Sequence, residues 1–340
     1  GLDVATIGEA YIALQSGVPA SDLTLHGNNK SMEELRYAVD NGIGKVVIDS
    51  FDEIDKIEHL YATTRKPIKA LVRVTPGVEA YTHKYVTTGQ VDSKFGFTVQ
   101  NGQAGKAIER AKSSGAIDLI GLHAHIGSQI FTSDSFRKST DILVKLAEHF
   151  GLPELCVGGG LGVPYLNDES SISISEWGRI VHDISNSSSA TLKITSEPGR
   201  SIVASSAVTI YTVGTIKEIE GVRTYVAVDG GMHDNPRPAL YGSDYETFLA
   251  RSINEPREQK ITLVGKHCES GDVLVKEGDI QGDLVIGDLL VTPVTGAYGH
   301  SMGSNYNKVL RPAVVFVQGG KSRLVLRREE LSDLLNSDVA

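Results

Sequence analysis

The first part of the chain alternates short apolar runs with segments that carry a helical pattern of apolar positions. Nearly continuous apolar runs bounded by polar or glycine-rich turns are typical of strands that are buried on both faces. Seven runs have this form: Leu2–Ala5, Leu23–His26, Lys45–Asp49, Lys69–Thr75, Asp118–His125, Glu154–Val157 and Leu192–Ser196. Alternating strands and helices predict an α/β fold with a parallel sheet, and this spacing favours a (β/α)8 barrel over a doubly wound sheet. Because the chain starts inside strand-like sequence, we expect the barrel to lack its first strand.

Three of the intervening segments carry a helix start signal in which serine is followed three residues later by glutamate. They begin at Ser31, Ser50 and Ser173. Serine at such a position accepts a hydrogen bond from a free amide of the first turn, and the glutamate can reach back to the serine amide. Each segment is therefore predicted to be a helix that begins just after its serine.

Beyond Ser201 the pattern changes to β-rich runs separated by glycine, asparagine and proline. The runs are Val203–Val213, Thr224–Asp229, Ile261–Gly265, Asp288–Val294, Val314–Gln318 and Ser322–Leu326. Short strands with turn signals and little helical period indicate a separate antiparallel β domain. We therefore predict a barrel domain over residues 1–202 and a β domain over residues 203–340.

Composition and charge exclude several classes of protein. The chain has 340 residues, with 33 lysines and arginines against 42 acids and a net charge of −9. Such a charge repels a polyphosphate backbone, so we expect no nucleic-acid partner. No apolar run reaches the roughly 18 residues of a membrane span, so we expect no membrane partner. Two cysteines without metal-ligand spacing indicate a reducing compartment, by default the cytoplasm, and no metal site.

Polar residues follow three consecutive strands of the predicted barrel, where barrels place their active sites. They are His125 and Ser128, the glycines Gly158–Gly160, and the segment from Glu197 through Gly199 to Arg200. Each also has an ordinary structural explanation: a hydrogen-bonded histidine, a tight turn, and a local ion pair. Their convergence at neighbouring strand ends favours a site for an anionic cofactor or substrate.

The β domain has its own polar cluster directly after the run Ile261–Gly265. Cys268 is followed by Glu269 and Ser270, and a buried structural cysteine is the alternative interpretation. The polar neighbours argue against a core position for this thiol. Two turn-rich loops carry further residues of types that bind anions, namely Arg237, Tyr241 and Tyr298.

In this order and spacing, the motifs resemble those of the diaminopimelate decarboxylases. The resemblance runs through essentially the whole chain and is carried by His123–Gln129, Gly158–Gly162, Glu197–Arg200, Asp229–Met232, Cys268–Asp272 and Gly296–Tyr298. It is also seen at Gly1–Val4, His26–Lys30, Lys94–Gly96 and Asn305–Asn307. The family implies pyridoxal 5'-phosphate as cofactor, an alanine-racemase-like barrel with a C-terminal β domain, and decarboxylation of meso-diaminopimelate to L-lysine.

The resemblance also implies roles for the cofactor-binding residues. His125 would stack on the pyridine ring, and Glu197 would hold the ring nitrogen, which keeps the ring a strong electron sink. The phosphate would be bound by the backbone or side chains of Ser128, Gly158, Gly159, Gly160, Gly199, Arg200 and Tyr298.

Catalysis and substrate choice follow from the same resemblance. Cys268, next to Glu269, would return a proton to the carbon that loses carbon dioxide, and in this family a partner subunit presents it within a homodimer. The substrate contacts would be Arg200, Arg237, Tyr241, Glu269, Ser270 and Tyr298. An arginine suits the distal carboxylate of diaminopimelate, which ornithine lacks, although a surface arginine is the common alternative.

One family residue has no counterpart in this sequence. The Schiff-base lysine follows the first barrel strand, upstream of the segment that matches Gly1, and neither Lys30 nor Lys94 matches it. We expect a truncated chain of an active enzyme. The alternatives are a non-catalytic homologue that regulates a decarboxylase, and a decarboxylase of another amino acid such as ornithine or arginine.

Overall fold

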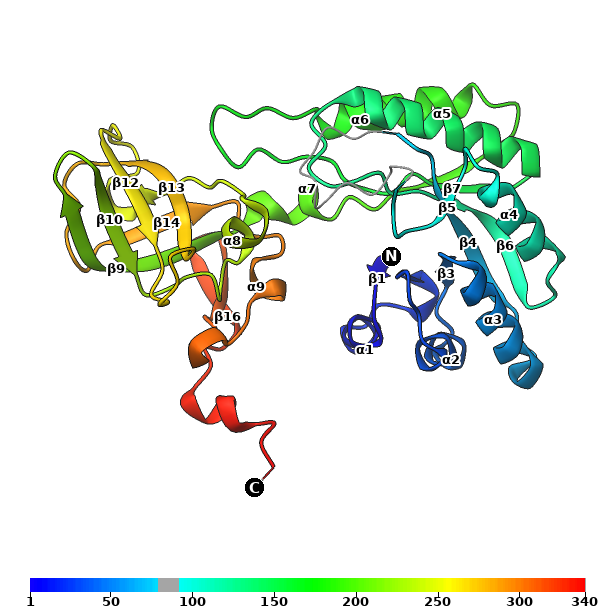
Figure 1. Ribbon diagram of the computed structural model, residues 1–340, viewed down its shortest axis with the longest axis horizontal. Coiled ribbons are helices and arrows are strands. Elements are labelled where there is room, and N and C mark those ends of the chain that lie inside the picture. The colour runs from blue at the N-terminus through cyan, green and yellow to red at the C-terminus, as the bar shows by residue number, and fades with distance from the viewer. Residues whose placement is uncertain (79–91, 340) are drawn as a thin grey trace. The chain divides into compact units, whose positions relative to one another are not determined.

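The protein, seen in a computed structural model, folds into two compact units. Residues 1–78 and 92–339 are described. The first unit comprises Gly1–Gly162 and Ser170–Gly199, and the second comprises Val163–Glu169 and Arg200–Ala340. Figure 1 shows α/β structure in the first unit and mainly strands in the second. None of the helices in the described ranges has the length and apolarity that crossing a membrane requires.

The first unit is built on a parallel sheet that forms half of a barrel. Its strands lie in the order β1-β2-β3-β4-β6-β7-β8, with the short β5 paired to β4, so β1 and β8 are the edges of the described sheet. The bounds are β1 (Leu2–Val4), β2 (Leu23–Leu25), β3 (Lys45–Ile48), β4 (Ile68–Thr75), β5 (Phe97–Thr98), β6 (Ile117–His123), β7 (Glu154–Cys156) and β8 (Lys193–Thr195). The seven predicted barrel strands are confirmed, and β5 was not predicted.

Three helices of this unit, α2, α3 and α6, begin where the serine signals place them. Ser31 and Glu34 form the full reciprocal capping box, and Ser50 and Ser173 each accept a hydrogen bond from the amide three residues on. The bounds are α1 (Ile7–Gln15), α2 (Met32–Asn41), α3 (Phe51–Thr64), α4 (Gln103–Ser113), α5 (Ser133–Phe150) and α6 (Ile174–Asn186). These caps satisfy amides that the first turn leaves without a partner in the helix.

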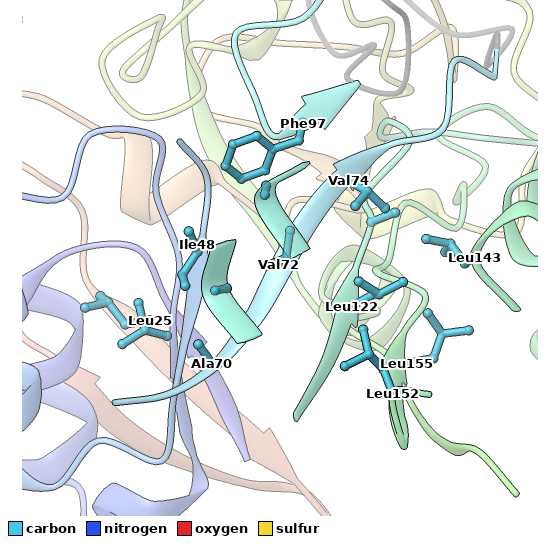
Figure 2. Packing of buried hydrophobic residues seen from close by; sticks show 14 of the residues in the cluster. Leu25, Ile48, Ala70, Val72, Val74, Phe97, Leu122, Leu143, Leu152 and Leu155 are labelled. Atoms are coloured by element: carbon cyan, nitrogen blue, oxygen red, sulfur yellow. The ribbon is translucent and has the colours of Figure 1, made fainter. Parts of the chain in front are cut away.

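The core of the first unit lies between the sheet and these helices. Alternate strand residues such as Ile48, Val72 and Leu155 pack together with helix residues such as Leu143, as Figure 2 shows. The intervening residues Val47, Leu71 and Cys156 form a separate small cluster on the other face. Because side chains alternate along a strand, the face turned away from the helices is free to carry the polar residues of a site.

The second unit contains a six-stranded sheet in the order β11-β14-β9-β10-β12-β13 and a separate hairpin of β15 and β16. The bounds are β9 (Val208–Ile219), β10 (Arg223–Val228), β11 (Phe248–Leu249), β12 (Gln259–Val264), β13 (Val273–Ile280), β14 (Leu289–Pro293), β15 (Val314–Gln318) and β16 (Lys321–Leu326). Short helices are α7 (Arg200–Val203), α8 (Arg237–Tyr241) and α9 (Gly299–Met302). The separate β domain is confirmed, but β10 and β12 pair in parallel, so the sheet is mixed where an antiparallel one was predicted.

Candidate active site

A row of polar side chains crosses the carboxyl ends of the barrel strands. Arg73 pairs in register with His123, His123 with Cys156, and Cys156 with Thr195. Neighbours in register on a parallel sheet point to the same face, here the face that the helices do not cover. The side chains of Arg73, His123 and Cys156 are buried.

Glu197 follows β8 and lies at the centre of this row. Its carboxylate contacts His123 (Nε2 to Oε2, 3.0 Å), the Cys156 thiol (Sγ to Oε1, 3.0 Å) and His26 (Nε2 to Oε1, 3.3 Å). His26 also faces Asp3 at 3.6 Å. Burial alone would raise the pKa of Glu197, but the two histidines outweigh it and hold this pKa well below its usual range. Glu197 is therefore a carboxylate at neutral pH.

The two histidines that contact Glu197 differ in charge. Burial lowers the pKa of His123, which fits a neutral ring whose Nε2–H donates to Glu197. Burial would also lower the pKa of His26, but the nearby carboxylates of Asp3 and Glu197 outweigh it and raise this pKa to about 9. His26 is therefore a cation that faces the glutamate.

The turn that carries His26 is fixed by Lys30, a buried residue in the predicted motif. The Lys30 ammonium donates to the carbonyls of Gly27 (2.7 Å) and Val47 (2.6 Å) and pairs with Glu53 at 2.8 Å. Two hydrogen bonds and one ion pair thus surround the ammonium, so this buried charge is compensated within the protein. Lys30 thus has a structural role, which agrees with its not matching the Schiff-base lysine.

His125 lies two residues beyond the row. The Gly159 amide donates to its Nδ1 (3.3 Å), which places the remaining proton on Nε2. Burial, and then the nearby Arg73 and His123, lowers the pKa of His125 to about 4, so its ring is neutral. A neutral, fixed imidazole next to a glycine turn is suited to packing against an aromatic ring of a ligand.

The glycine turn after β7 approaches its neighbours too closely for side chains. A Cβ on Gly159 would lie 2.0 Å from the Glu197 carbonyl oxygen, and one on Gly160 would lie 2.1 Å from that of Gly127. The Gly159 amide donates to His125 Nδ1. Within the described ranges, the Gly160 amide donates to no acceptor of the protein. Among the glycines of this turn, Gly160 therefore has an amide that is available to a phosphate.

The remaining residues predicted in this unit lie nearby in the chain. Ser128 is half-buried in the loop after β6, which is tied to the glycine turn by the isolated bridge between Ile130 and Leu161. Gly199 ends the unit, and a Cβ there would meet no atom within 4 Å. The structure thus gathers His125, Glu197 and the glycine turn, with Ser128 on the adjoining loop.

In the second unit, two buried arginines share a cage of tyrosines. Arg200 donates to the Tyr165 hydroxyl (2.6 Å) and lies 4.8 Å from the centre of the Tyr298 ring. Arg237 lies 5.8, 5.3 and 5.6 Å from the ring centres of Tyr165, Tyr241 and Tyr298. Four of the predicted substrate contacts are thus brought together, and Tyr165 is a member that the sequence did not indicate.

Arg237 is 5% exposed, and its charge has no counter-ion in the described parts of the chain. Its Nη2 donates to the Ser243 hydroxyl (3.2 Å), and its Nε has no acceptor. A buried cation without an anion is costly, and an isolated one persists where a ligand can neutralise it. The cage is therefore suited to a ligand that carries a carboxylate or phosphate.

Cys268, Glu269 and Ser270 are exposed on the loop between β12 and β13. The base of this loop is fixed by Asp272, whose carboxylate accepts hydrogen bonds from the His267 amide (2.9 Å) and the Met232 amide (2.7 Å). The Tyr306 hydroxyl donates to Glu269. The loop therefore presents a thiol and a carboxylate to solvent from a fixed base, and Cys268 is not the core cysteine that was the alternative.

The raised pKa of His26 predicts a pH-dependent stability. A folded-state pKa of about 9 lies above the ordinary 6.5 of the unfolded chain, so the stabilisation is complete below about pH 6.5 and is lost as the pH rises through 9. We expect wild type to exceed His26→Gln in free energy of unfolding by on the order of 2–3 kcal/mol at pH 6, and by much less above pH 9. Urea unfolding across this range measures the difference.

The control for this prediction is His182→Gln, since the His182 side chain is 70% exposed on α6. This control should follow wild type at every pH. A constant difference between wild type and His26→Gln from pH 6 to 10 would contradict the assigned charge of His26.

The comparisons with known proteins agree on one family. A family model described as "Pyridoxal-dependent decarboxylase, pyridoxal binding domain" matches residues 1–204. The diaminopimelate decarboxylase of Bacillus subtilis (strain 168) is 45% identical over 349 residues, which cover 99% of this chain and 79% of that protein. The diaminopimelate decarboxylase of Staphylococcus aureus (strain COL) is 42% identical over 345 residues, covering 99% and 81%.

A solved structure agrees with the sequence relatives. The crystal structure of diaminopimelate decarboxylase from Helicobacter pylori complexed with L-lysine is similar with a TM-score of 0.90 and 30% identity, and the match covers 98% of this chain and 83% of that chain. The fold, the matched domain and the relatives along nearly the whole chain therefore lead to the same conclusion. This chain belongs to the diaminopimelate decarboxylases, which are pyridoxal-dependent decarboxylases.

Proposed function

We propose that this protein uses pyridoxal 5'-phosphate to decarboxylate meso-diaminopimelate to L-lysine. The observation that carries the choice of substrate is Arg237, a guanidinium buried among tyrosines without a counter-ion in the described chain. Diaminopimelate has a second carboxylate at its distal end, and a planar guanidinium can bind such a group with two hydrogen bonds. Ornithine has no distal carboxylate that would neutralise this charge.

The barrel residues fit the cofactor. A carboxylate has about four acceptor positions, and the three contacts of Glu197 leave one for the protonated ring nitrogen. His125 offers a neutral ring face, while the Gly160 amide and the Ser128 hydroxyl are of types that bind phosphate. The close contacts of the glycine turn exclude side chains that would fill this cradle.

The chemistry divides between the cofactor and the chain. Bound pyridoxal phosphate supplies an electron sink for the electron pair that stays on the α-carbon when carbon dioxide departs. Glu197 holds the proton on the ring nitrogen, and Arg237 orients the substrate by its distal carboxylate. The Cys268 thiol donates a proton to the α-carbon, with Glu269 beside it, so that one carbon dioxide leaves and one proton is added.

We also propose that the protein acts as a homodimer in the cytoplasm. Homodimerisation would bring the exposed loop with Cys268 and Glu269 to the site of a partner subunit, and Ser270 would contact the substrate there. The free thiols of Cys156 and Cys268 support a reducing location, the cytoplasm.

The test compares kcat/KM for three amino acids, using the full-length protein loaded with pyridoxal phosphate. We expect release of carbon dioxide and formation of L-lysine from meso-diaminopimelate, with kcat/KM at least 10-fold above that for L-ornithine or L-arginine. A higher kcat/KM for ornithine or arginine would identify a different decarboxylase. Cofactor binding without turnover of any of the three would favour the non-catalytic homologue.

A further inference from the structure

Glu197 and the three residues that contact it come from four separate strands of the barrel sheet. His26 follows β2, His123 ends β6, Cys156 ends β7, and Glu197 itself follows β8. The ligand-type atoms of His26, His123 and Glu197 all lie within 4.8 Å of one another. Other charged groups facing this cluster are Asp3, behind His26, and Arg73, which is held by Asp49 at 3.5 Å.

Two of these contacts direct a hydrogen-bond donor at the carboxylate, and the third, from His26, brings a positive charge close to it. His123 donates through Nε2, Cys156 through its thiol, and His26 faces Oε1 with a charged ring. Because His123 Nδ1 has no partner, a second proton there would be buried without an acceptor, so this ring remains a neutral donor. The carboxylate is thus stabilised from several sides while one acceptor position stays open.

Such an arrangement matters because a buried carboxylate competes for the proton of a pyridine nitrogen. Burial disfavours the charged form of a carboxyl group and raises its proton affinity towards that of the ring. A glutamate without donors would then take the proton from the ring nitrogen and leave a neutral pyridine, which is a weaker electron sink. Donors to the carboxylate lower its proton affinity and keep the proton on the ring.

We propose that His26, His123 and Cys156 are positioning residues that hold the Glu197 carboxylate as an acceptor, so that the proton of the cofactor stays on its ring nitrogen. The proposal rests on the proposed contact between Glu197 and that nitrogen. It assigns a function to three residues that act through Glu197 and that contact neither the substrate nor the phosphate in the arrangement proposed above.

The experiment measures the ring proton directly, without turnover. Protein is loaded with 15N-labelled pyridoxal phosphate, and the resonance of the ring nitrogen reports whether it is protonated at pH 7.5. We expect protonated nitrogen in wild type and a shift towards the unprotonated position in His123→Leu. Rescue is expected in His123→Gln, whose amide N–H can replace the Nε2–H donor.

Cys156→Ala and Cys156→Ser provide a second pair with a smaller structural change. Alanine removes the thiol donor and should shift the resonance in the same direction as His123→Leu, whereas serine keeps a donor and should resemble wild type. If His123→Leu does not fold, this pair still tests whether donors to Glu197 keep the ring nitrogen protonated. His182→Leu, an exposed change on α6, is the matched control and should leave the resonance unchanged.

Turnover should follow the ring proton. Residues that orient a metal ligand are typically worth about 10–100-fold in activity, and we expect a similar contribution from a residue that orients Glu197. The kcat with diaminopimelate should therefore fall by that factor in His123→Leu and largely recover in His123→Gln. Equal losses in His123→Leu and His123→Gln with a protonated ring in both would show that His123 only fills space, and the proposal would be overturned.

Further outcomes distinguish a failure of this inference from a failure of the proposed function. If Glu197→Gln leaves the ring nitrogen protonated, Glu197 is not its partner and the inference fails, whether or not diaminopimelate is a substrate. If wild type does not decarboxylate diaminopimelate but the resonance responds as expected, the proposed substrate fails and the inference stands. A stoichiometric zinc ion that copurifies with the cofactor-loaded protein and is lost in His123→Leu would also overturn it, because the cluster would then be a metal site.

Discussion

Replacing Cys268 by alanine is expected to lower kcat with diaminopimelate by about 10²–10⁴-fold, the usual contribution of a positioned general acid. The thiol is exposed on a loop whose base is fixed by Asp272, and Glu269 beside it is held by Tyr306. Retention of pyridoxal phosphate should not change, because the proposed cofactor contacts lie on other elements. Steady-state kinetics and the absorbance of bound cofactor measure the two effects separately.

The control for this prediction is Lys266→Ala, an exposed change at the start of the same loop. It should keep turnover within a few-fold of wild type. Parallel loss of cofactor and turnover in Cys268→Ala would contradict the assignment of the thiol as a proton donor to the substrate.

A mixed dimer tests whether the thiol serves a partner subunit. Cys268→Ala subunits and Glu197→Gln subunits are each expected to be nearly inactive alone. If the loop of one subunit completes the site of the other, mixing them should restore activity at one of the two sites of each mixed dimer. No recovery would place each complete site within one chain.

The half-barrel could be predicted from the sequence because its signals are local. Every predicted strand of the first unit is a nearly continuous apolar run, and Ser31, Ser50 and Ser173 cap their helices as the serine–glutamate spacing indicates. These features depend on neighbours within a few residues of each other.

The start of β9 shows where local signals fail. The run from Val203 reads as a strand, but residues 200–206 form helical turns and β9 begins at Val208. The first ladder position pairs Val208 with Pro293, after which Val294 has a φ of 60°. The partner strand therefore ends there, and residues before Val208 have no strand to pair with, whatever their β propensity.

The candidate site was only partly predictable for a related reason. Glu197 and His125 stand in recognisable motifs, but the contacts of Glu197 with His26, His123 and Cys156 depend on the register of four strands. A one-residue shift would turn each side chain to the other face of the sheet. The available signal was position, since each of these residues lies near the end of an apolar run or just after one.

The second large effect is expected at Arg237, whose replacement by lysine should lower kcat/KM for diaminopimelate by about 30- to 5,000-fold. This range corresponds to about 2–5 kcal/mol, the typical cost of disrupting a buried, hydrogen-bonded charge pair. Lysine keeps the charge but loses the planar fork and the stacking on Tyr241 and its neighbours. Kinetics with diaminopimelate, and with an analogue whose distal carboxylate is replaced by hydrogen, measure the effect.

The analogue shows whether Arg237→Lys removes recognition of the distal carboxylate or disrupts the site as a whole. If Arg237 binds the distal carboxylate, kcat/KM for the analogue should be nearly the same in wild type and Arg237→Lys. Arg257→Lys is the matched control, because Arg257 also stacks on an aromatic ring, Phe248, but already has a counter-ion in Glu246. Equal losses on both substrates would mean that Arg237 supports the tyrosine cage and does not select the substrate, and the preference for diaminopimelate over ornithine would then need another origin.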